Sequence, residues 1–197
     1  MRYALLTLFC FALVTSAARA GGTPDTDDES LQMLFEFNGL SGMDLDVYAG
    51  GLGMRYFIDD EGLACRFSLN SGYRTDEEDS DKHTVSLIGG SILIEKFFES
   101  VSSVAPYVGI GFAGFYHSEK WPTEEGERKT NKTFLEIPGV AGFQWWFTDA
   151  LAVGGEYRLA LRYISTKDYL RDQSISDGEE MNVGFYAASV FLTVAIK

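Results

Sequence analysis

The chain has 197 residues, of which 46% are hydrophobic and 14% aromatic, and its formal net charge is −13. This length is enough for one domain with a sizeable core. Such an acidic balance argues against nucleic acid as a partner and against general attraction to anionic lipid. The two cysteines are Cys10 and Cys65.

The first twenty residues have the composition of a secretory signal peptide. Arg2 precedes an apolar run from Ala4 to Val14, and Ala18-Arg19-Ala20 supplies an A-x-A-type cleavage site. The run is far shorter than the ~20 residues of a membrane-spanning helix. We therefore predict a signal peptide at 1–20, an acidic lead-in at 21–30 and one barrel domain at 31–197. Cleavage would leave Cys65 alone, so no intrachain disulfide is expected.

From Leu31 onward, apolar and polar residues alternate with a period of two, which is typical of β-strands with one apolar and one polar face. The clearest case is the segment 134–163, where two long arms meet at Thr148-Asp149-Ala150. Each arm reaches the ~9–11 residues that a tilted strand needs to cross a bilayer. Eight strands are predicted, at about 31–38, 47–58, 63–73, 83–97, 106–117, 134–147, 151–163 and 182–196.

The strand at 83–97 is the least regular of the eight. Val85, Leu87 and Leu93 share one face, whereas Ile88, Ile92 and Ile94 share the other. Apolar residues on both faces predict a β-bulge that switches the register within this strand.

The connections between the strands mostly alternate in character. The turns at 59–62 and 148–150 are tight, whereas 74–82, 118–132 and 165–181 are long and hydrophilic and are predicted to be loops. Short periplasmic turns and longer external loops are typical of outer-membrane barrels, in which an even number of strands closes the sheet.

Period two does not say which face of the sheet points outward. A secreted lipocalin-like barrel would place the apolar face inside, around a ligand. Here the polar face is rich in glycine and alanine, which suits a narrow lumen. Aromatic residues also gather near the strand ends, as in two interfacial girdles; they are Tyr56, Phe57, Phe97, Phe98 and 145–147 at one end and Tyr73, Tyr116 and Tyr163 at the other. Both features favour an apolar face that contacts lipid.

The segments YAGGLGMRYFIDDEGLACRFSLNSGYR (48–74) and PYVGIGFAGFY (106–116), together with 134–163, resemble the outer-membrane β-barrel domain family. That family includes the membrane domain of outer membrane protein A and opacity-type surface proteins. The resemblance implies an all-β, eight-stranded antiparallel up-and-down transmembrane β-barrel in a Gram-negative outer membrane. Many such barrels end in an aromatic residue, whereas this sequence ends Val194-Ala195-Ile196-Lys197.

Charged residues fall on the polar face of several predicted strands. An eight-stranded barrel is just wide enough inside for side chains, and buried charges are costly unless they pair. A polar plug that fills the lumen is therefore favoured over an ion path. The predicted lumenal network consists of Glu36, Arg55, Arg66, Glu136, Glu156, Arg158 and Arg162.

The sequence contains two histidines, His83 and His117. Some eight-stranded outer-membrane enzymes modify lipid A with a serine and a histidine on one strand face. Here Ser86 and Ser118 fall on the faces opposite to the histidines that precede them, so no catalytic residue is predicted. No zinc spacing, phosphate loop or nucleotide fingerprint occurs, and neither a metal nor a cofactor is expected.

These observations predict a monomeric outer-membrane barrel with a structural or surface-interaction role. Its expected partners are outer-membrane lipid, lipopolysaccharide and a surface partner that its loops contact. Trp121 and Tyr169 are aromatic residues in the predicted loops and are the candidates for that contact. A small-solute channel or a lipid A-modifying enzyme remains the alternative.

Overall fold

The computed structural model describes residues 31–38, 49–58, 61–78, 81–123, 126–171 and 173–196. The predicted signal peptide and lead-in lie outside these ranges. Within them, no helix is long and apolar enough to cross a membrane. The described chain consists of β1 (Leu31–Asn38), β2 (Ala49–Phe57), β3 (Leu63–Glu78), β4 (Asp81–Phe97), β5 (Val104–Thr123), β6 (Gly126–Trp146), β7 (Leu151–Leu170) and β8 (Gln173–Ile196).

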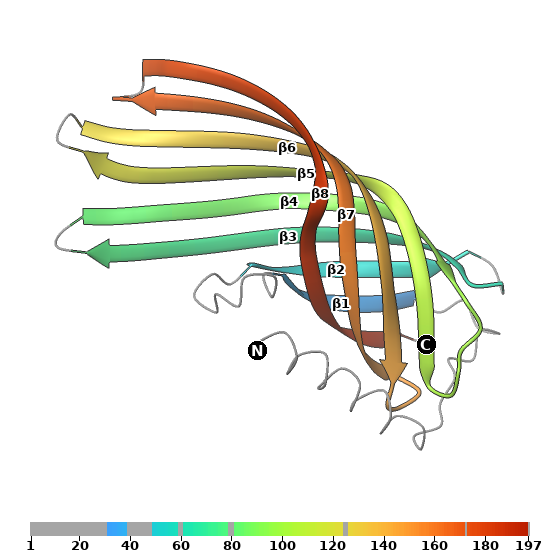
Figure 1. Cartoon of the computed structure of the whole chain (residues 1–197). Coiled ribbons are helices and arrows are strands. Elements are labelled where there is room, and N and C mark those ends of the chain that lie inside the picture. Colours follow the sequence, from blue (N-terminus) through green and yellow to red (C-terminus); the bar gives the residue numbers. More distant parts are fainter. Residues whose placement is uncertain are drawn as a thin grey trace, which may run out of the picture.

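The strands form a closed barrel in which each pairs with the next along the chain and β8 returns to β1. All of these pairs are antiparallel, and β1 closes the ring along the register Leu31↔Ile196 to Asn38↔Ser189. The predicted up-and-down topology is confirmed. Figure 1 shows the short β1 and β2 beside the much longer strands β3 to β8, whose hairpins project past the barrel.

The apolar face of the sheet points outward, as predicted for a barrel that contacts lipid. Glu136 and Glu156 are buried, whereas their sequence neighbours Ile137 and Tyr157 are exposed. A lipocalin-like barrel would show the reverse. Exposed apolar side chains occur on every strand, for example Phe35, Leu52, Leu69, Ile88, Phe112, Leu135, Leu161 and Phe185.

The predicted bulge in the strand 83–97 is wrong. β4 keeps an unbroken register with β3 and with β5. Ile92 and Ile94 face outward, whereas Leu93 is completely buried inside. The sequence misleads because Leu93 belongs to a small apolar cluster with Leu34 and Val140 inside the lumen, so both faces of β4 carry aliphatic residues. The register shifts instead between β7 and β8, where the partners of Arg158 and Leu159 are Ala187 and Phe185.

Three segments predicted as loops are mostly strand. β3 and β4 extend over most of 74–82, β5 and β6 over most of 118–132, and β7 and β8 over most of 165–181. These parts are mostly polar on both faces, as expected where strands leave the membrane and both faces meet water. An apolar alternation therefore cannot reveal them. We call their assembly, formed by residues 73–78, 81–86, 118–123, 126–132, 165–170 and 173–181, the outer sheet.

The predicted aromatic girdle at the turn end is only partly correct. Tyr56, Phe98 and Phe147 are exposed, whereas Phe97 and Trp146 are buried inside the barrel. Consecutive aromatic residues alternate between the two faces, so part of each run turns inward. At the other end Tyr73 and Tyr116 are exposed as predicted.

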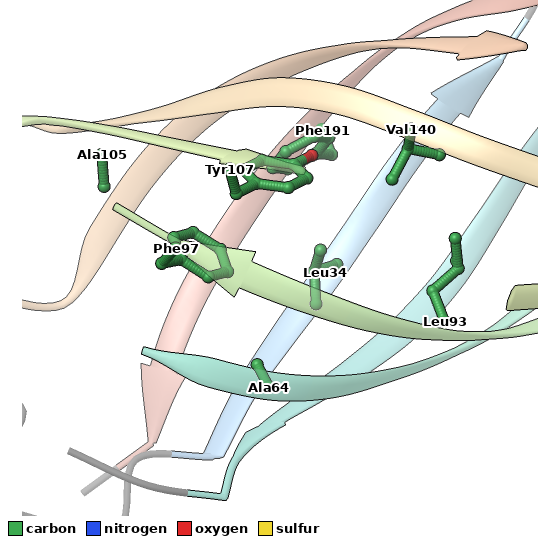
Figure 2. Packing of buried hydrophobic residues seen from close by; sticks show 8 residues of the cluster. All are labelled: Leu34, Ala64, Leu93, Phe97, Ala105, Tyr107, Val140 and Phe191. Atoms are coloured by element: carbon green, nitrogen blue, oxygen red, sulfur yellow. The ribbon is translucent and has the colours of Figure 1, made fainter. Parts of the chain in front are cut away.

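The inward aromatic residues form a layer across the turn end of the lumen. The Phe97 and Tyr107 rings stack with centroids 4.8 Å apart, and Phe191 lies 6.5 Å from Tyr107. Figure 2 shows these three rings together. We call Phe97, Tyr107 and Phe191 the aromatic layer. It shares one buried apolar cluster with Leu34, Ala64, Leu93, Ala105 and Val140.

Candidate functional site: the charged lumen and the outer sheet

The seven charged residues predicted to line the lumen all lie on the inner face of the barrel. Six are buried, and Arg162 has a side chain that is 22% exposed. The structure divides them between an inner cluster beside the aromatic layer and an outer cluster nearer the outer sheet. The inner cluster contains Arg55, Arg66 and Glu156, and the outer cluster contains Glu136, Arg158 and Arg162. Glu36 is hydrogen-bonded by Ser68 and lies near enough to Arg66 for their charges to interact.

Glu95 is the centre of the inner cluster. Its carboxylate lies 2.6 Å from Nε of Arg55 and 3.2 Å from Nε of Arg66. Arg66 also reaches Glu156, with Nη1 2.9 Å from Oε2. The Tyr107 hydroxyl donates to the same Glu156 oxygen at 2.7 Å. Two arginines and two glutamates from four strands are thus joined in one chain of ion pairs.

Arg55 connects this cluster to the aromatic layer. Its guanidinium lies 4.9 Å from the ring centroid of Phe97, 5.1 Å from that of Tyr107 and 5.8 Å from that of Phe191. A guanidinium over an aromatic face is attracted by the ring quadrupole, more strongly when it is removed from water. The arginine and the three rings therefore lie at the same level of the lumen.

The outer cluster is organised by Glu136. Arg162 donates to Glu136 through Nε and also approaches it through Nη2. Arg158 lies 3.9 Å from the other carboxylate oxygen. The Arg162 guanidinium also lies 5.1 Å from the ring centroid of Phe134. Glu136 and Arg162 are direct partners on β6 and β7, so their approach follows from the register.

Glu36 is held by neutral groups. The Ser68 hydroxyl donates to it at 2.5 Å, and the Asn70 amide nitrogen lies 3.5 Å away. Among the described residues below the outer sheet, the lumen thus contains four arginines and four glutamates whose formal charges cancel. They are Arg55, Arg66, Arg158, Arg162, Glu36, Glu95, Glu136 and Glu156.

Sequence reasoning missed Glu95 and the uncharged members of the network. Gln144 donates to Thr193 at 2.9 Å and to Gln32 at 3.4 Å, and all three are buried. Gln32 also accepts a bond from Arg55 at 3.2 Å. The signal for Glu95 was its position two residues after Leu93. An unbroken alternation along β4 would have placed it in the lumen.

The inner face of the outer sheet carries a second group of polar and aromatic contacts. His83 Nε2 lies 2.8 Å from Glu119 Oε1 across β4 and β5. The Trp121 ring meets His83 edge-on, and the Arg128 guanidinium lies 5.5 Å from its centroid. Thr130 donates to Asp168 at 2.5 Å. These contacts tie β4, β5, β6 and β7 together beyond the membrane.

Trp121 and Tyr169 therefore lie on strands β5 and β7 rather than in loops. Ser86 donates to the backbone carbonyl of Ser118 at 3.4 Å, away from the His83–Glu119 pair. Among the residues that the structure describes, no group of three or more His, Cys, Asp or Glu side chains is placed to hold a metal ion.

No family model matches the chain, and no curated protein matches it in sequence. Solved structures do resemble it. A major outer membrane protein from Thermus thermophilus has 8% identity and a TM-score of 0.56, covering 85% of this chain and 98% of its own. The N-terminal β-barrel domain of Pseudomonas aeruginosa OprF has 15% identity and a TM-score of 0.43, covering 86% and 98%.

Ail, the attachment invasion locus protein of Yersinia pestis, has 15% identity and a TM-score of 0.45, covering 84% of this chain and 93% of its own. At such identities the likeness concerns the fold. The chain has the fold of an eight-stranded outer-membrane β-barrel. Its apolar exterior is the surface that such a barrel presents to lipid, so the protein belongs in an outer membrane.

Proposed function

We propose that this protein is a closed outer-membrane barrel that holds a rigid sheet outside the membrane for contact with a surface partner. The observation that supports this most is the set of ion pairs and aromatic contacts inside the barrel. Four arginines pair with Glu95, Glu136 and Glu156 in the part of the lumen that adjoins the aromatic layer and extends toward the outer sheet. A conducting pore needs space between its side chains, and eight strands leave little of it.

Of the residues that the structure describes, those of the outer sheet are the ones best placed for recognition. Its strands are continuous with the membrane barrel, so the barrel fixes their position. Binding residues tend to occur on segments that a rigid scaffold presents to solvent. His83, Trp121 and Arg128 supply cationic and aromatic groups on the inner face of this sheet.

Shortening one outer hairpin tests the proposal. Residues 121–128 would be removed and Lys120 joined to Lys129, its register partner, through an Asn-Gly turn. We expect the variant to keep the mobility shift of a folded barrel between unboiled and boiled gel samples. Adhesion of bacteria that carry the variant to host cells or matrix should fall.

The matched control inserts two residues into the turn at 148–150, at the opposite end of the barrel. Adhesion should then be unchanged. If the shortened hairpin and the control both leave every surface phenotype intact, the outer sheet has no such role. A lost lipid A modification in a His83→Ala variant would instead favour an enzyme.

A further inference from the structure

Glu36 differs from the other three glutamates of the lumen in its partners. Each of the other three contacts at least one guanidinium, whereas Glu36 contacts none among the described residues. Arg66 is near enough for its charge to act on Glu36, but it is already in contact with Glu95 and Glu156. A buried carboxylate that lacks a cation in contact is costly. The charge of Glu36 is therefore only partly balanced by the arginines.

The side chains around Glu36 lie on a part of β2 that has glycine on its inner face. The Ser68 hydroxyl donates to Glu36 at 2.5 Å, and the Asn70 amide nitrogen lies 3.5 Å from it. A Cβ atom built on Gly53 would lie 3.0 Å from Oε1 of Glu36 and 3.1 Å from Oγ of Ser68. One built on Gly51 would lie 2.6 Å from Oδ1 of Asn70. The two glycines thus let three polar side chains rest directly on the strand.

Two oxygen atoms at this place have no hydrogen-bond partner within the part of the chain that the structure describes. They are Oδ1 of Asn70 and Oγ of Ser91, the register partner of Ser68 on β4. Glu36, Ser68, Asn70 and Ser91 are only 5%, 4%, 6% and 8% exposed. Buried polar atoms without a partner are rare in folded proteins and unfavourable. We call these four residues the oxygen cradle.

The oxygen cradle offers the kind of ligands that a hard cation takes. Carboxylate, amide and hydroxyl oxygens are such ligands, and the Ser68 oxygen keeps its lone pairs after its proton is donated to Glu36. Its single carboxylate matches a single positive charge. A divalent ion would leave an excess charge in a buried site beside Arg66. The composition therefore favours a monovalent metal cation.

We propose that the oxygen cradle binds a sodium ion inside the barrel. The ion balances Glu36 and gives Oδ1 of Asn70 and Oγ of Ser91 a partner. A water molecule satisfies such oxygens as well, but it leaves the charge as it is. The ligands come from β1, β3 and β4, so the ion joins the short β1 to two longer strands. This inference goes beyond the proposed function, which concerns the outer sheet.

The whole chain, folded in zwitterionic detergent, would be unfolded with urea in sodium chloride and in choline chloride at equal ionic strength. An ion that binds only the folded protein raises its stability with its concentration. We expect a higher urea midpoint in sodium than in choline. Ser91→Ala should leave the midpoint in choline nearly unchanged, because its hydroxyl has no partner there. It should raise the sodium concentration needed for half of the effect by about tenfold.

Two further variants and a control make the test specific. Glu36→Gln should abolish the difference between sodium and choline, whereas Asn70→Asp, which adds a second carboxylate, should lower the sodium concentration needed. Ser118→Ala is the control, because Ser118 is equally buried but lies in the outer sheet; it should keep the full sodium effect. The boiling-dependent gel shift shows whether each variant folds.

Equal midpoints in sodium and choline would overturn the proposal. So would an unchanged sodium effect in both Ser91→Ala and Asn70→Asp. Neither result bears on whether the outer sheet binds a partner, so the proposed function is tested separately.

Discussion

At the scale of single residues, Glu95 joins the two arginines of the inner cluster. It is completely buried, and its two oxygens approach guanidiniums from two different strands. Each guanidinium has other partners, Gln32 for Arg55 and Glu156 for Arg66. A buried ion pair adds little net stability, but removing one member leaves an uncompensated charge in a medium of low dielectric constant.

We therefore expect Glu95→Gln to lower the free energy of unfolding by about 3–5 kcal/mol. Urea titration of the protein folded in detergent would measure the loss. Glu61→Gln is the matched control. The Glu61 side chain is exposed, and its ion pair with Lys96 is long, at 4.0 Å. This substitution should therefore change stability by less than about 0.5 kcal/mol. A Glu95→Gln variant as stable as the control would show that the inner cluster is not a coupled network.

The charged positions in the lumen were largely predictable from the sequence, but their pairing was not. Alternation alone puts Glu136, Glu156 and Arg162 on the inner face, because their neighbours are strongly apolar. Which carboxylate meets which guanidinium depends on the register between strands. Arg66 and Glu156 are ninety residues apart in the chain and meet across the barrel. No local pattern carries that information.

At the scale of elements, three glycines on the inner face are covered by aromatic rings from a neighbouring strand. Tyr107 is the register partner of Gly142, Phe115 of Gly89 and Phe191 of Gly154. A Cβ atom built on Gly154 would lie 2.2 Å from the Phe191 ring. The glycines on the polar face therefore make room for rings that lie flat on the sheet.

Gly154 and Gly155 on β7 give a matched pair for testing this packing. Gly154→Ala should destabilise the barrel by about 1–3 kcal/mol, because the Phe191 ring must move. At Gly155 the nearest atom outside its chain neighbours is a Phe143 ring carbon at 3.6 Å, so Gly155→Ala should be neutral or slightly stabilising. Thermal unfolding of both variants would measure the difference in stability. Equal losses of stability in the two variants would mean that the Phe191 ring does not restrict position 154.

The lengths of the strands could not be predicted from the sequence. Within the membrane, lipid selects apolar residues on one face, and the period of two is clear, as at Leu159 and Leu161. Beyond it, β5 and β6 continue with residues such as Glu119, Lys120, Lys129 and Thr130, which are polar on both faces. Their pairing depends on backbone hydrogen bonds and contacts such as that between Arg128 and Trp121. Neither produces a hydropathy pattern.

At the scale of the whole molecule, the described chain combines a barrel with an open sheet. Among the residues described, β3 beyond Gly72 pairs only with β4, and β8 before Ser189 pairs only with β7. The six longer strands thus leave the closed ring together as one sheet (Figure 1). Topology and orientation followed from strand number, turn spacing and the apolar face. The outer sheet did not, because water leaves both of its faces polar.

The central claim is that this lumen is closed, and conductance across a planar lipid bilayer tests it most directly. We expect the inserted protein to give no steady current, because the aromatic layer and the paired charges lie in the path that an ion would take. Insertion would be verified independently by protease protection of the membrane-embedded strands. Large, steady, ion-selective currents that change with Arg158→Ala would contradict the account and identify the protein as a channel.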